Sequence, residues 1–319
     1  MTSRSRRVLT RCGIALGLCL CLATAGCADS ATPVEAARPA PQRPQAAGGM
    51  APERAAAELP AQEGAQGRGT RPDLAQREAA ARRERAGVVA AARRWGLAEA
   101  PIAAPAPPAT RPVLRPGPGV RFHGDLPAVV HRVPTDERVV FLTIDDGAEK
   151  DPDFARMVRE LKVPFSAFVS GYLARQDYGY FRGLHEQGVS VNNHTLNHPD
   201  LRTLGYARQQ QEICRQQDEL TREIGETPRL FRPPYGEFNE DTLRAARSCG
   251  IVAFPIWNQE AFPDHLEYRY DHVFKPGDII LTHFRGPGQW KGDMTQMLRR
   301  VLDAVTREGF ALARLDDYL

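Results

Sequence analysis

The sequence predicts an α/β fold over residues 121–319, in which helices cover a parallel sheet that is either open or closed into a barrel. Two observations carry this prediction. Short apolar runs rich in β-branched residues alternate with helical patterns along this stretch, and polar clusters directly follow several of the apolar runs. Such alternation is typical of parallel sheets. About 200 residues are also enough to bury one sizeable hydrophobic core.

Strands are expected where apolar and β-branched residues form a short run between turn-forming residues. These runs are residues 138–144, 164–170, 189–193, 230–232, 251–256, 278–283 and 310–315. Helical patterns fill the intervals between them. These patterns are residues 153–161, 172–186, 206–224, 239–248 and 294–308. In such folds the chemistry takes place at the carboxyl ends of the strands, so the residues just after each strand are the first candidates for a site.

The first 120 residues differ in composition from the rest. They contain one aromatic residue, Trp95, and no histidine, whereas all eight histidines lie later. Residues 28–120 are rich in Ala, Pro and Arg and have almost nothing to bury, so we expect a disordered linker. Within it, residues 73–97 favour a transient helix with a thin apolar face. The body after residue 120 is mildly acidic, which excludes a basic nucleic-acid-binding domain.

Residues 1–27 have the layout of a secretory signal peptide. A basic start precedes an apolar stretch, residues 13–25, that is too short to span a bilayer. Residues 24–27 resemble a bacterial lipobox, although the first position is Thr rather than Leu, and Cys27 is then the lipidated residue. Residues 23–25 instead fit cleavage of a freely secreted form. We expect an exported cell-envelope lipoprotein that meets the membrane only through a lipid on Cys27, with secretion as the alternative.

Export also bears on the cysteines of the body. Four of the six cysteines lie in or beside the signal, which leaves Cys214 and Cys249. Two cysteines in an exported protein suggest one disulfide, provided that their Cα atoms lie within about 7 Å. Two buried free thiols are the alternative, and the sequence leaves both open.

Two polar clusters carry residues that suit a metal site. Asp145 and Asp146 end an apolar strand, and because neighbours on a strand point to opposite sides, Gly147 is expected to break the strand and re-aim them. One carboxylate can then bind a metal while the other acts as a base. His194 and His198 have the spacing that puts both rings on one face of a helical turn, where they can hold Zn²⁺. A strand-ending turn and two ordinary histidines are the structural alternatives.

Two further clusters suit the handling of charge and protons. Arg232 begins an Arg-Pro-Pro-Tyr-Gly segment, whose prolines stiffen the loop that carries Tyr235. A rigid loop with one fixed cation can orient a carboxylate and aim a backbone N–H. His283 ends the apolar run 278–283 and can act as a general acid near neutral pH. Each cluster alone is weak, but all four occupy the places where a parallel α/β fold builds its site.

In order and wording, the clusters resemble the motifs of the polysaccharide deacetylase (NodB-homology) family of carbohydrate esterases. The resemblance covers roughly residues 136–319. The matching motifs are residues 143–147 (with Ile144 in place of the family's Phe), 194–198, 232–235 and 281–283. This resemblance implies a distorted (β/α) barrel of about seven strands and the removal of N- or O-linked acetyl groups from a polysaccharide.

The resemblance also implies a divalent metal, usually zinc, with cobalt as an alternative. Asp146, His194 and His198 match the metal ligands of the family and leave open positions for water and substrate.

Five further residues match catalytic positions of the family. Asp145 matches the general base, and Arg232 matches the cation that holds it. With the metal, Arg232 is expected to lower the pKa of Asp145. The backbone N–H of Tyr235 matches an oxyanion donor, and Leu281 matches the residue that lines the acetyl pocket. His283 matches the acid that protonates the leaving amine, and it needs a carboxylate neighbour to raise its pKa.

The sequence departs from the family at one motif, Asp-x-x-Asp-Trp, whose second Asp pairs with the acid histidine. Residues 257–265 contain no Asp-Trp pair. Glu260 or Asp264 is expected to stand in, and Trp257 is expected to line the substrate groove. Trp290, in a Gly-rich loop, is either a sugar-stacking platform or a packing residue.

We therefore expect a monomeric, metal-dependent hydrolase that removes acetyl groups from a cell-envelope polysaccharide. N-acetylglucosamine of peptidoglycan or of a chitin-like polymer is the expected substrate, and a long linker of the kind that reaches the cell wall favours peptidoglycan. The alternative is a catalytically inactive lipoprotein that binds glycan on the same fold.

Overall fold

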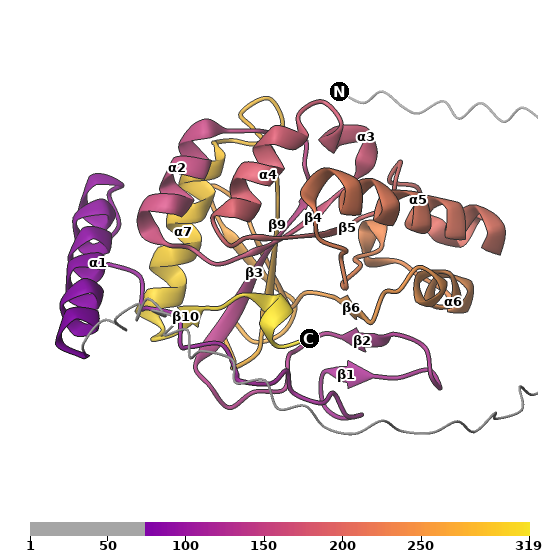
Figure 1. The fold of residues 1–319 in the computed structure, drawn as a ribbon, viewed down its shortest axis with the longest axis horizontal. Coiled ribbons are helices and arrows are strands. Elements are labelled where there is room, and N and C mark those ends of the chain that lie inside the picture. The colour runs from indigo at the N-terminus through magenta and orange to yellow at the C-terminus, as the bar shows by residue number, and fades with distance from the viewer. Residues whose placement is uncertain (1–73) are drawn as a thin grey trace, which may run out of the picture. The chain divides into compact units, whose positions relative to one another are not determined.

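A computed structural model describes residues 74–319 of the chain (Figure 1). The expected signal peptide, Cys27 and the first part of the expected linker lie outside the described residues. Among residues 74–319, no helix combines the length and the apolar character needed to cross a membrane.

A seven-stranded sheet runs through the centre of the body. Its strands pair in parallel, except that β8 runs antiparallel to β7. In spatial order they are β5 (Ser190–Asn193), β4 (Ser166–Val169), β3 (Val139–Asp146), β9 (Ile279–His283), β7 (Gln259–Ala261) and β8 (Leu266–Tyr268), with β10 (Ala311–Leu312) paired to the start of β3. All eight residues of β3 are buried, as expected for a strand that is covered on both faces.

A second sheet of three strands completes the wall of the body. It consists of β1 (Val120–Arg121), β2 (Ala128–Val130) and β6 (Ala253–Pro255), and β2 runs parallel to β6. Isolated bridges join the two sheets at both edges, from Phe231 to β5, from Leu230 to β6, and between Arg132 and Asp278. The strands therefore close into an irregular ring, which confirms the expected distorted barrel.

Gly277 permits the closure between β2 and β9. Its φ is +84°, and a Cβ atom there would lie 1.9 Å from the carbonyl oxygen of Val133. The amide of Val133 donates to the carbonyl of Gly277 at 2.8 Å, so the two segments touch through their backbones. Only glycine fits this approach.

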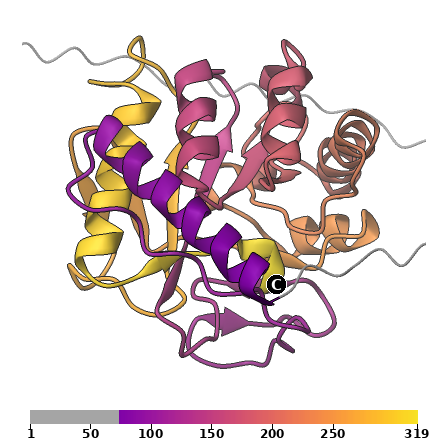
Figure 2. The same ribbon diagram turned by 60° about the vertical axis from the view of Figure 1, so that its left-hand side comes forward.

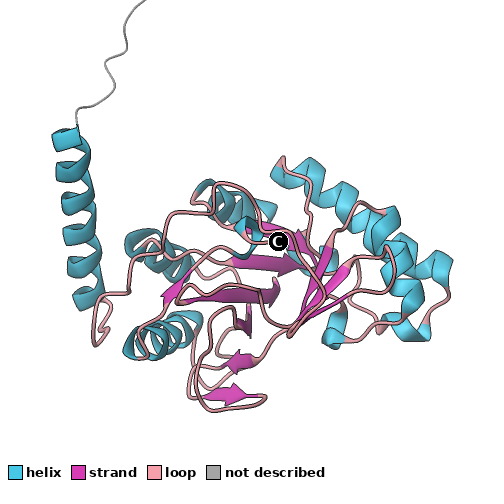
Figure 3. Ribbon diagram, turned by 90° about the horizontal axis from the view of Figure 1, so that it is seen from below, coloured by secondary structure: helices cyan, strands magenta, loops and turns pink. Residues whose placement is uncertain are grey.

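Helices cover the outside of the strands (Figure 3). The helices of the body are α2 (Pro152–Leu161), α3 (Gly171–Ala174), α4 (Tyr178–Glu186), α5 (Tyr206–Ile224), α6 (Glu240–Ser248) and α7 (Met294–Arg307). Short 3₁₀ turns occur at Leu201–Thr203, Pro234–Gly236 (η2) and Leu315–Asp317. Capping side chains explain where two of these helices begin. The carboxylate of Asp151 accepts a hydrogen bond from the amide of Asp153 at the start of α2, and Asp293 and Gln296 form a capping box at the start of α7.

Several expected elements differ from the structure. The helix expected over 172–186 is two helices, because the side chain of Asp177 caps the amide of Tyr180 and starts α4 anew. The strand expected over 230–232 is reduced to single bridges. Four strands, β1, β2, β7 and β8, are not among the predictions, since runs of two or three residues carry no readable alternation.

The prediction of a linker with only a transient helix is wrong from residue 74 onward. Helix α1 (Leu74–Arg94) lies against α2, and Val88, Ala91 and Ala92 are buried there (Figure 2). Trp95 fixes the end of the helix, because its Nε1 donates to Glu160 at 2.9 Å. The apolar face of α1 is thin, as predicted, but its small residues allow close packing that only the tertiary structure supplies.

The disulfide alternative holds in the structure. Cys214 of α5 and Cys249 at the end of α6 are joined, with their Cα atoms 5.0 Å apart. The bond ties together two neighbouring helices that cover β5 and β6.

Candidate metal centre and active site

The four polar clusters meet at the carboxyl ends of the strands. Asp145 near the end of β3 lies beside His283 at the end of β9, and the two residues are partners in the parallel register. His194 follows β5 directly, and the amide of Arg232 donates to the carbonyl of Asn193 at the end of β5. The carboxyl ends of parallel strands lie at one edge of the sheet, so clusters that are far apart in the sequence meet in one site.

Three of these residues form a potential metal-binding group. Asp146, His194 and His198 each offer one donor atom, and the three atoms lie within 4.8 Å of one another. Asp146 Oδ1 lies 3.7 Å from His194 Nε2 and 3.4 Å from His198 Nε2. A carboxylate and two imidazoles, with room for further ligands, match the donors of catalytic zinc sites.

The protonation of the two imidazoles suits metal binding. His194 Nδ1 lies 2.6 Å from the carbonyl oxygen of Arg232, which can only accept, so this nitrogen carries the proton and Nε2 keeps its lone pair. Burial lowers the pKa of both His194 and His198 to about 4, so both rings are neutral at neutral pH. Burial acts to raise the pKa of Asp146, but the surrounding histidines and Arg285 outweigh it and lower that pKa.

Left-handed backbone conformations bring these side chains together. Asp146 has a φ of 77°, Thr195 of 70°, His198 of 56° and Tyr235 of 63°. The turn of Asp146 lets two adjacent carboxylates face the same site, a task that the sequence prediction gave to Gly147 alone. Such conformations cost of order 1–3 kcal/mol each and are concentrated at functional sites.

The predicted helical turn between His194 and His198 is wrong. Residues 194–200 form an irregular loop, in which the Thr195 hydroxyl accepts a hydrogen bond from the amide of His198 at 3.0 Å. The two rings nevertheless lie 4.8 Å apart between centroids. The loop replaces the helix because Thr195 and His198 both have positive φ, which ends helical hydrogen bonding.

Asp145 is held by a buried arginine. Arg232 Nη1 donates to Asp145 Oδ1 at 2.7 Å and to the hydroxyl of Thr143 at 2.8 Å, and Nε donates to the carbonyl of Pro255 at 2.9 Å. The guanidinium also lies 4.5 Å from the ring centre of Phe168. Burial raises the pKa of Asp145. Arg232 acts to lower it, as expected, but burial outweighs the arginine, so the expected net lowering is wrong for the protein without metal.

Glu260, not Asp264, is the carboxylate beside His283. Glu260 Oε1 lies 3.6 Å from His283 Nδ1, whereas Asp264 is exposed and bonded to His265. Glu260 reaches this place because β7 pairs with β9, which puts it beside Leu281 in the register. Burial nevertheless lowers the pKa of His283 to about 4, so the expected raising of that pKa is wrong.

The three residues of the predicted pocket, Tyr235, Leu281 and Trp257, differ in depth and in position. The exposed ring of Tyr235 lies 4.9 Å from the ring of His198. Leu281 is buried in β9. Trp257 is half-buried behind the site, where a Cβ atom on Gly236 would lie 2.9 Å from its ring. Trp257 therefore packs under the loop of Tyr235.

Trp290 is a packing residue in the structure. It is half-buried and packs against the main core, with its ring 6.4 Å from that of Phe262. The sequence left this alternative open beside the sugar-stacking one.

Arg285 and Tyr172 are residues of the site that the sequence reasoning missed. Arg285 Nη2 donates to Asp146 Oδ2 at 3.2 Å. The exposed Tyr172 of α3 lies close enough to Asp146 and Arg285 for both to influence its pKa, which burial raises. Strand β9 ends at His283, and the amide of Arg285 donates to the carbonyl of His283 at 3.0 Å, so a turn after the strand places Arg285 and no strand pattern in the sequence indicates it.

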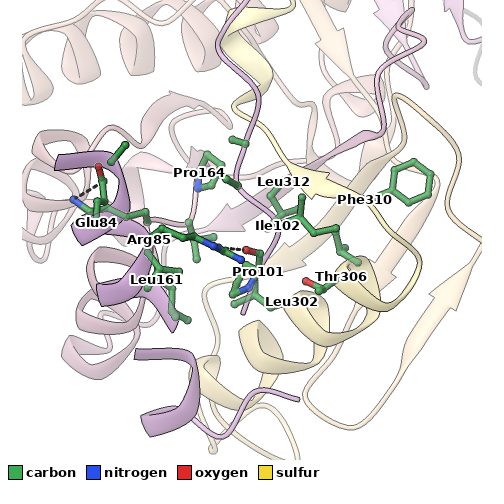
Figure 4. Close-up of a pocket in the computed structure, with 17 residues that line it drawn as sticks. Glu84, Arg85, Pro101, Ile102, Leu161, Pro164, Leu302, Thr306, Phe310 and Leu312 are labelled. Atoms are coloured by element: carbon green, nitrogen blue, oxygen red, sulfur yellow. Dashed lines mark hydrogen bonds and ion pairs between the residues drawn. The ribbon is translucent and has the colours of Figure 1, made fainter. Parts of the chain in front are cut away.

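An apolar cavity of about 340 Å³ contains none of these residues (Figure 4). It lies beside α1 and near β10, which pairs with the start of β3, so it is at the opposite end of the strands from the site. Its lining includes Val88, Ile102, Leu161, Leu302, Phe310 and Leu312. Its lining offers no cluster of ligands or nucleophiles, and the polar edge of the barrel is the candidate active site.

Known proteins resemble this chain in sequence and in fold. The family model described as "Polysaccharide deacetylase" matches residues 132–254, which hold three of the four clusters. An uncharacterized protein of Streptomyces coelicolor is 41% identical over 196 residues, which are 61% of this chain and 78% of that protein. The peptidoglycan-N-acetylmuramic acid deacetylase PdaA of Bacillus subtilis is 27% identical over 200 residues, 58% of this chain and 73% of PdaA.

A solved structure agrees with the fold. The peptidoglycan N-acetylglucosamine deacetylase Bc1960 superposes with a TM-score of 0.53 at 22% identity, over 60% of this chain and 92% of that one. At this identity the likeness concerns the fold alone. Together with the matching family model and the relatives, it confirms the resemblance of the four motifs: the chain belongs to the polysaccharide deacetylase family.

Proposed function

We propose that this protein is a metal-dependent deacetylase that hydrolyses the acetamide of an N-acetylated sugar in a cell-envelope polysaccharide, of the peptidoglycan or chitin type. The observation that carries the proposal is the convergence of a buried carboxylate, Asp145, with the potential metal ligands Asp146, His194 and His198. Asp145 Oδ2 lies 3.8 Å from His194 Nε2, while Arg232 occupies Oδ1. One oxygen of the Asp145 carboxylate, Oδ2, can thus act as a base beside the metal ligands.

Asp146, His194 and His198 would hold the metal, and their donors fit a divalent cation. The lone pair of His194 Nε2 is fixed by the bond from Nδ1, and the carboxylate of Asp146 is ionised. One carboxylate and two imidazoles favour zinc, with cobalt as the alternative. A divalent cation bound there supplies Lewis acidity to water and to the acetyl carbonyl.

The residues of the chain then divide the proton transfers and the binding. Asp145 takes a proton from the attacking water, and Arg232 holds it in place. The backbone N–H of Tyr235 donates to the developing oxyanion, and Leu281 lines the acetyl pocket with Trp257 behind it. His283 gives a proton to the sugar nitrogen as the C–N bond breaks, which releases acetate and leaves the free amine.

Glu260 takes the role of the missing Asp-Trp motif. Because burial lowers the pKa of His283, its ring is neutral at rest. The ring takes up a proton from solvent before it protonates the amine. The carboxylates of Asp145 and Asp146, and that of Glu260 at 3.6 Å from Nδ1, stabilise the charged ring. We infer that Glu260 is a positioning residue for His283. The inactive glycan-binding alternative gains no support, because the base and every potential ligand are present and adjacent.

We also propose that the protein acts outside the cytoplasmic membrane as a monomer. The relative PdaA is named for an action on peptidoglycan, which agrees with the predicted signal at residues 1–27. A lipid on Cys27, with secretion as the alternative, stays a prediction. Mass spectrometry of the mature protein isolated from membranes decides between a lipidated Cys27 and a cut after residue 25.

The activity is tested by acetate release from peptidoglycan, chitin oligomers and acetylxylan, with the full chain loaded with Zn²⁺ or Co²⁺. Asp145→Asn is expected to abolish release while it keeps the metal. His194→Ala is expected to lower the bound metal, measured by mass spectrometry, and chelation should stop release by the wild type. A metal-loaded wild type that releases no acetate from any of the three substrates would contradict the proposal.

A further inference from the structure

Arg285 is a cation of the site for which no matched motif provides a role. Its Nη2 donates to Asp146 Oδ2 at 3.2 Å, and 36% of its side chain is exposed. The bond to Asp146 uses one nitrogen of the guanidinium. Arginine offers five N–H donors in a planar fork, so donors remain for a ligand.

The turn that carries Arg285 is rigidly attached to the end of β3. The amide of Phe284 donates to the carbonyl of Asp145 at 3.0 Å, and the amide of Glu149 donates to the carbonyl of Phe284 at 2.9 Å. The ring of Phe284 is fully buried and packs edge-to-face against Phe154 and Phe181. The buried ring of Phe284 therefore fixes the backbone position of Arg285, its neighbour in the chain.

Two exposed tyrosines lie at the site: Tyr172 lies close to Arg285 and to Tyr235, and Tyr235 contacts the ring of His198. Tyr172 of α3 is 46% exposed, and Tyr235 of η2 is 64% exposed. Both α3 and the loop after β9 lie at the upper edge of the view in Figure 1. Aromatic faces beside one fixed cation suit a sugar ring that carries a negative charge.

Two other cations near the site, Arg232 and Lys150, are already engaged by groups of the protein. Arg232 is fully buried and bonded to Asp145. The ammonium of Lys150 donates to the carbonyls of Ala148 and Leu173 at 3.2 and 2.9 Å. Arg285 differs from both in its partly exposed guanidinium, whose one ion pair is with Asp146.

We propose that Arg285 binds the lactyl carboxylate of N-acetylmuramic acid, so that the acetyl group removed is the one on muramic acid residues of glycan strands without peptide stems, because a stem converts that carboxylate into a neutral amide. This inference rests on the proposed deacetylase function and names its substrate. In muramic acid the lactyl ether is on the sugar carbon next to the one that bears the acetamide. When the acetamide reaches the metal ligands, the carboxylate is therefore on the neighbouring carbon, within reach of a cation bonded to Asp146. N-acetylglucosamine has a neutral hydroxyl there, which offers the remaining N–H donors of the guanidinium no second carboxylate.

The test compares two substrates on two proteins. Glycan strands of alternating N-acetylglucosamine and N-acetylmuramic acid, without peptide stems, are used with the lactyl group as carboxylate or as its amide. The metal-loaded full chain and its Arg285→Gln variant are assayed, with Arg285→Lys and the distant Arg182→Gln as controls. Mass spectrometry of the digested strands identifies which sugar has lost its acetyl group, and the metal content of each variant is measured in parallel.

We expect the wild type to deacetylate muramic acid residues, with kcat/KM falling about 10–100-fold when either the substrate carboxylate or Arg285 is neutralised. Neutralising both should cost little more than neutralising one, because each change removes the same ion pair. Arg285→Lys should retain part of the rate, and Arg182→Gln all of it. A merely structural role of Arg285 would instead lower the rate equally on both forms of the substrate.

The outcomes separate this inference from the proposed function. Acetate lost only from N-acetylglucosamine residues, at the same rate in wild type and Arg285→Gln, would overturn the role of Arg285 and leave the deacetylase intact. If no substrate releases acetate, the proposed function fails. Calorimetric binding of free N-acetylmuramic acid and N-acetylglucosamine to the wild type and to Arg285→Gln still decides the role of Arg285 in that case, because the inference requires a preference for the muramic acid that Arg285→Gln abolishes.

Discussion

Replacement of Arg232 by methionine tests whether the buried ion pair with Asp145 organises the site. Methionine keeps most of the side-chain volume but removes the charge. Arg232 is 0% exposed and Asp145 is 3% exposed, so the variant leaves an unpaired carboxylate in the interior. Removing one partner of such a pair costs about 3–5 kcal/mol of unfolding free energy. The lost bond to the carbonyl of Pro255 adds about 1 kcal/mol.

The assay is urea unfolding followed by far-ultraviolet circular dichroism, in the presence of a chelator so that metal binding does not contribute. Adding Asp145→Asn to Arg232→Met should restore about 2 kcal/mol, because it removes the unpaired charge. Asp145→Asn alone should destabilise, because it strands the arginine. The exposed Arg244, which pairs with Asp241 on α6, serves as the matched control, and Arg244→Met should change the stability by less than about 1 kcal/mol. Equal costs for Arg232→Met and Arg244→Met, or strict additivity of the two site substitutions, would refute the reasoning.

Three further outcomes are expected. Glu260→Gln should lower kcat for acetate release by about tenfold or more, because the acid histidine loses its carboxylate neighbour, whereas Asp264→Asn should not; equal effects would contradict the assignment. Trp95→Ala should destabilise the protein by about 1–3 kcal/mol in urea unfolding, since Trp95 fixes the end of α1, and an unchanged midpoint would mean that α1 does not pack on the body. Replacing Cys214 and Cys249 together by serine should cost about 3–4 kcal/mol in the same measurement under oxidising conditions, given a sequence separation of 35 residues, and no loss would argue against the disulfide.

The sequence alone identified the four polar clusters that the structure brings together. Asp145, His194, Arg232 and His283 each follow an apolar run, and parallel strands bring their carboxyl ends to one edge of the barrel. That conclusion needs only the alternation of strands and helices. The motifs then give the family, because their order along the chain is specific.

The tertiary structure decided the properties that depend on neighbours far apart in sequence. The pKa directions of Asp145 and His283 differ from the expectation because burial outweighs the nearby charges, and burial is not readable from local sequence. The choice of Glu260 follows from the register of β7 on β9, which three-residue strands do not reveal. The positive φ of Asp146 is equally hidden, since the sequence offers Gly147 as the natural turn residue.

Helix α1 and Arg285 show the same limit of prediction from local sequence, the first for packing and the second for substrate recognition. The small buried residues of α1 give a weak helical pattern, and the helix is stable because α2 covers it. Arg285 stands in an unremarkable loop sequence, and its contact with Asp146 arises because Phe284 is anchored in the core. Local sequence patterns identify the chemical groups of this protein. Their charge states and their contacts are set by packing between segments that are far apart in the sequence.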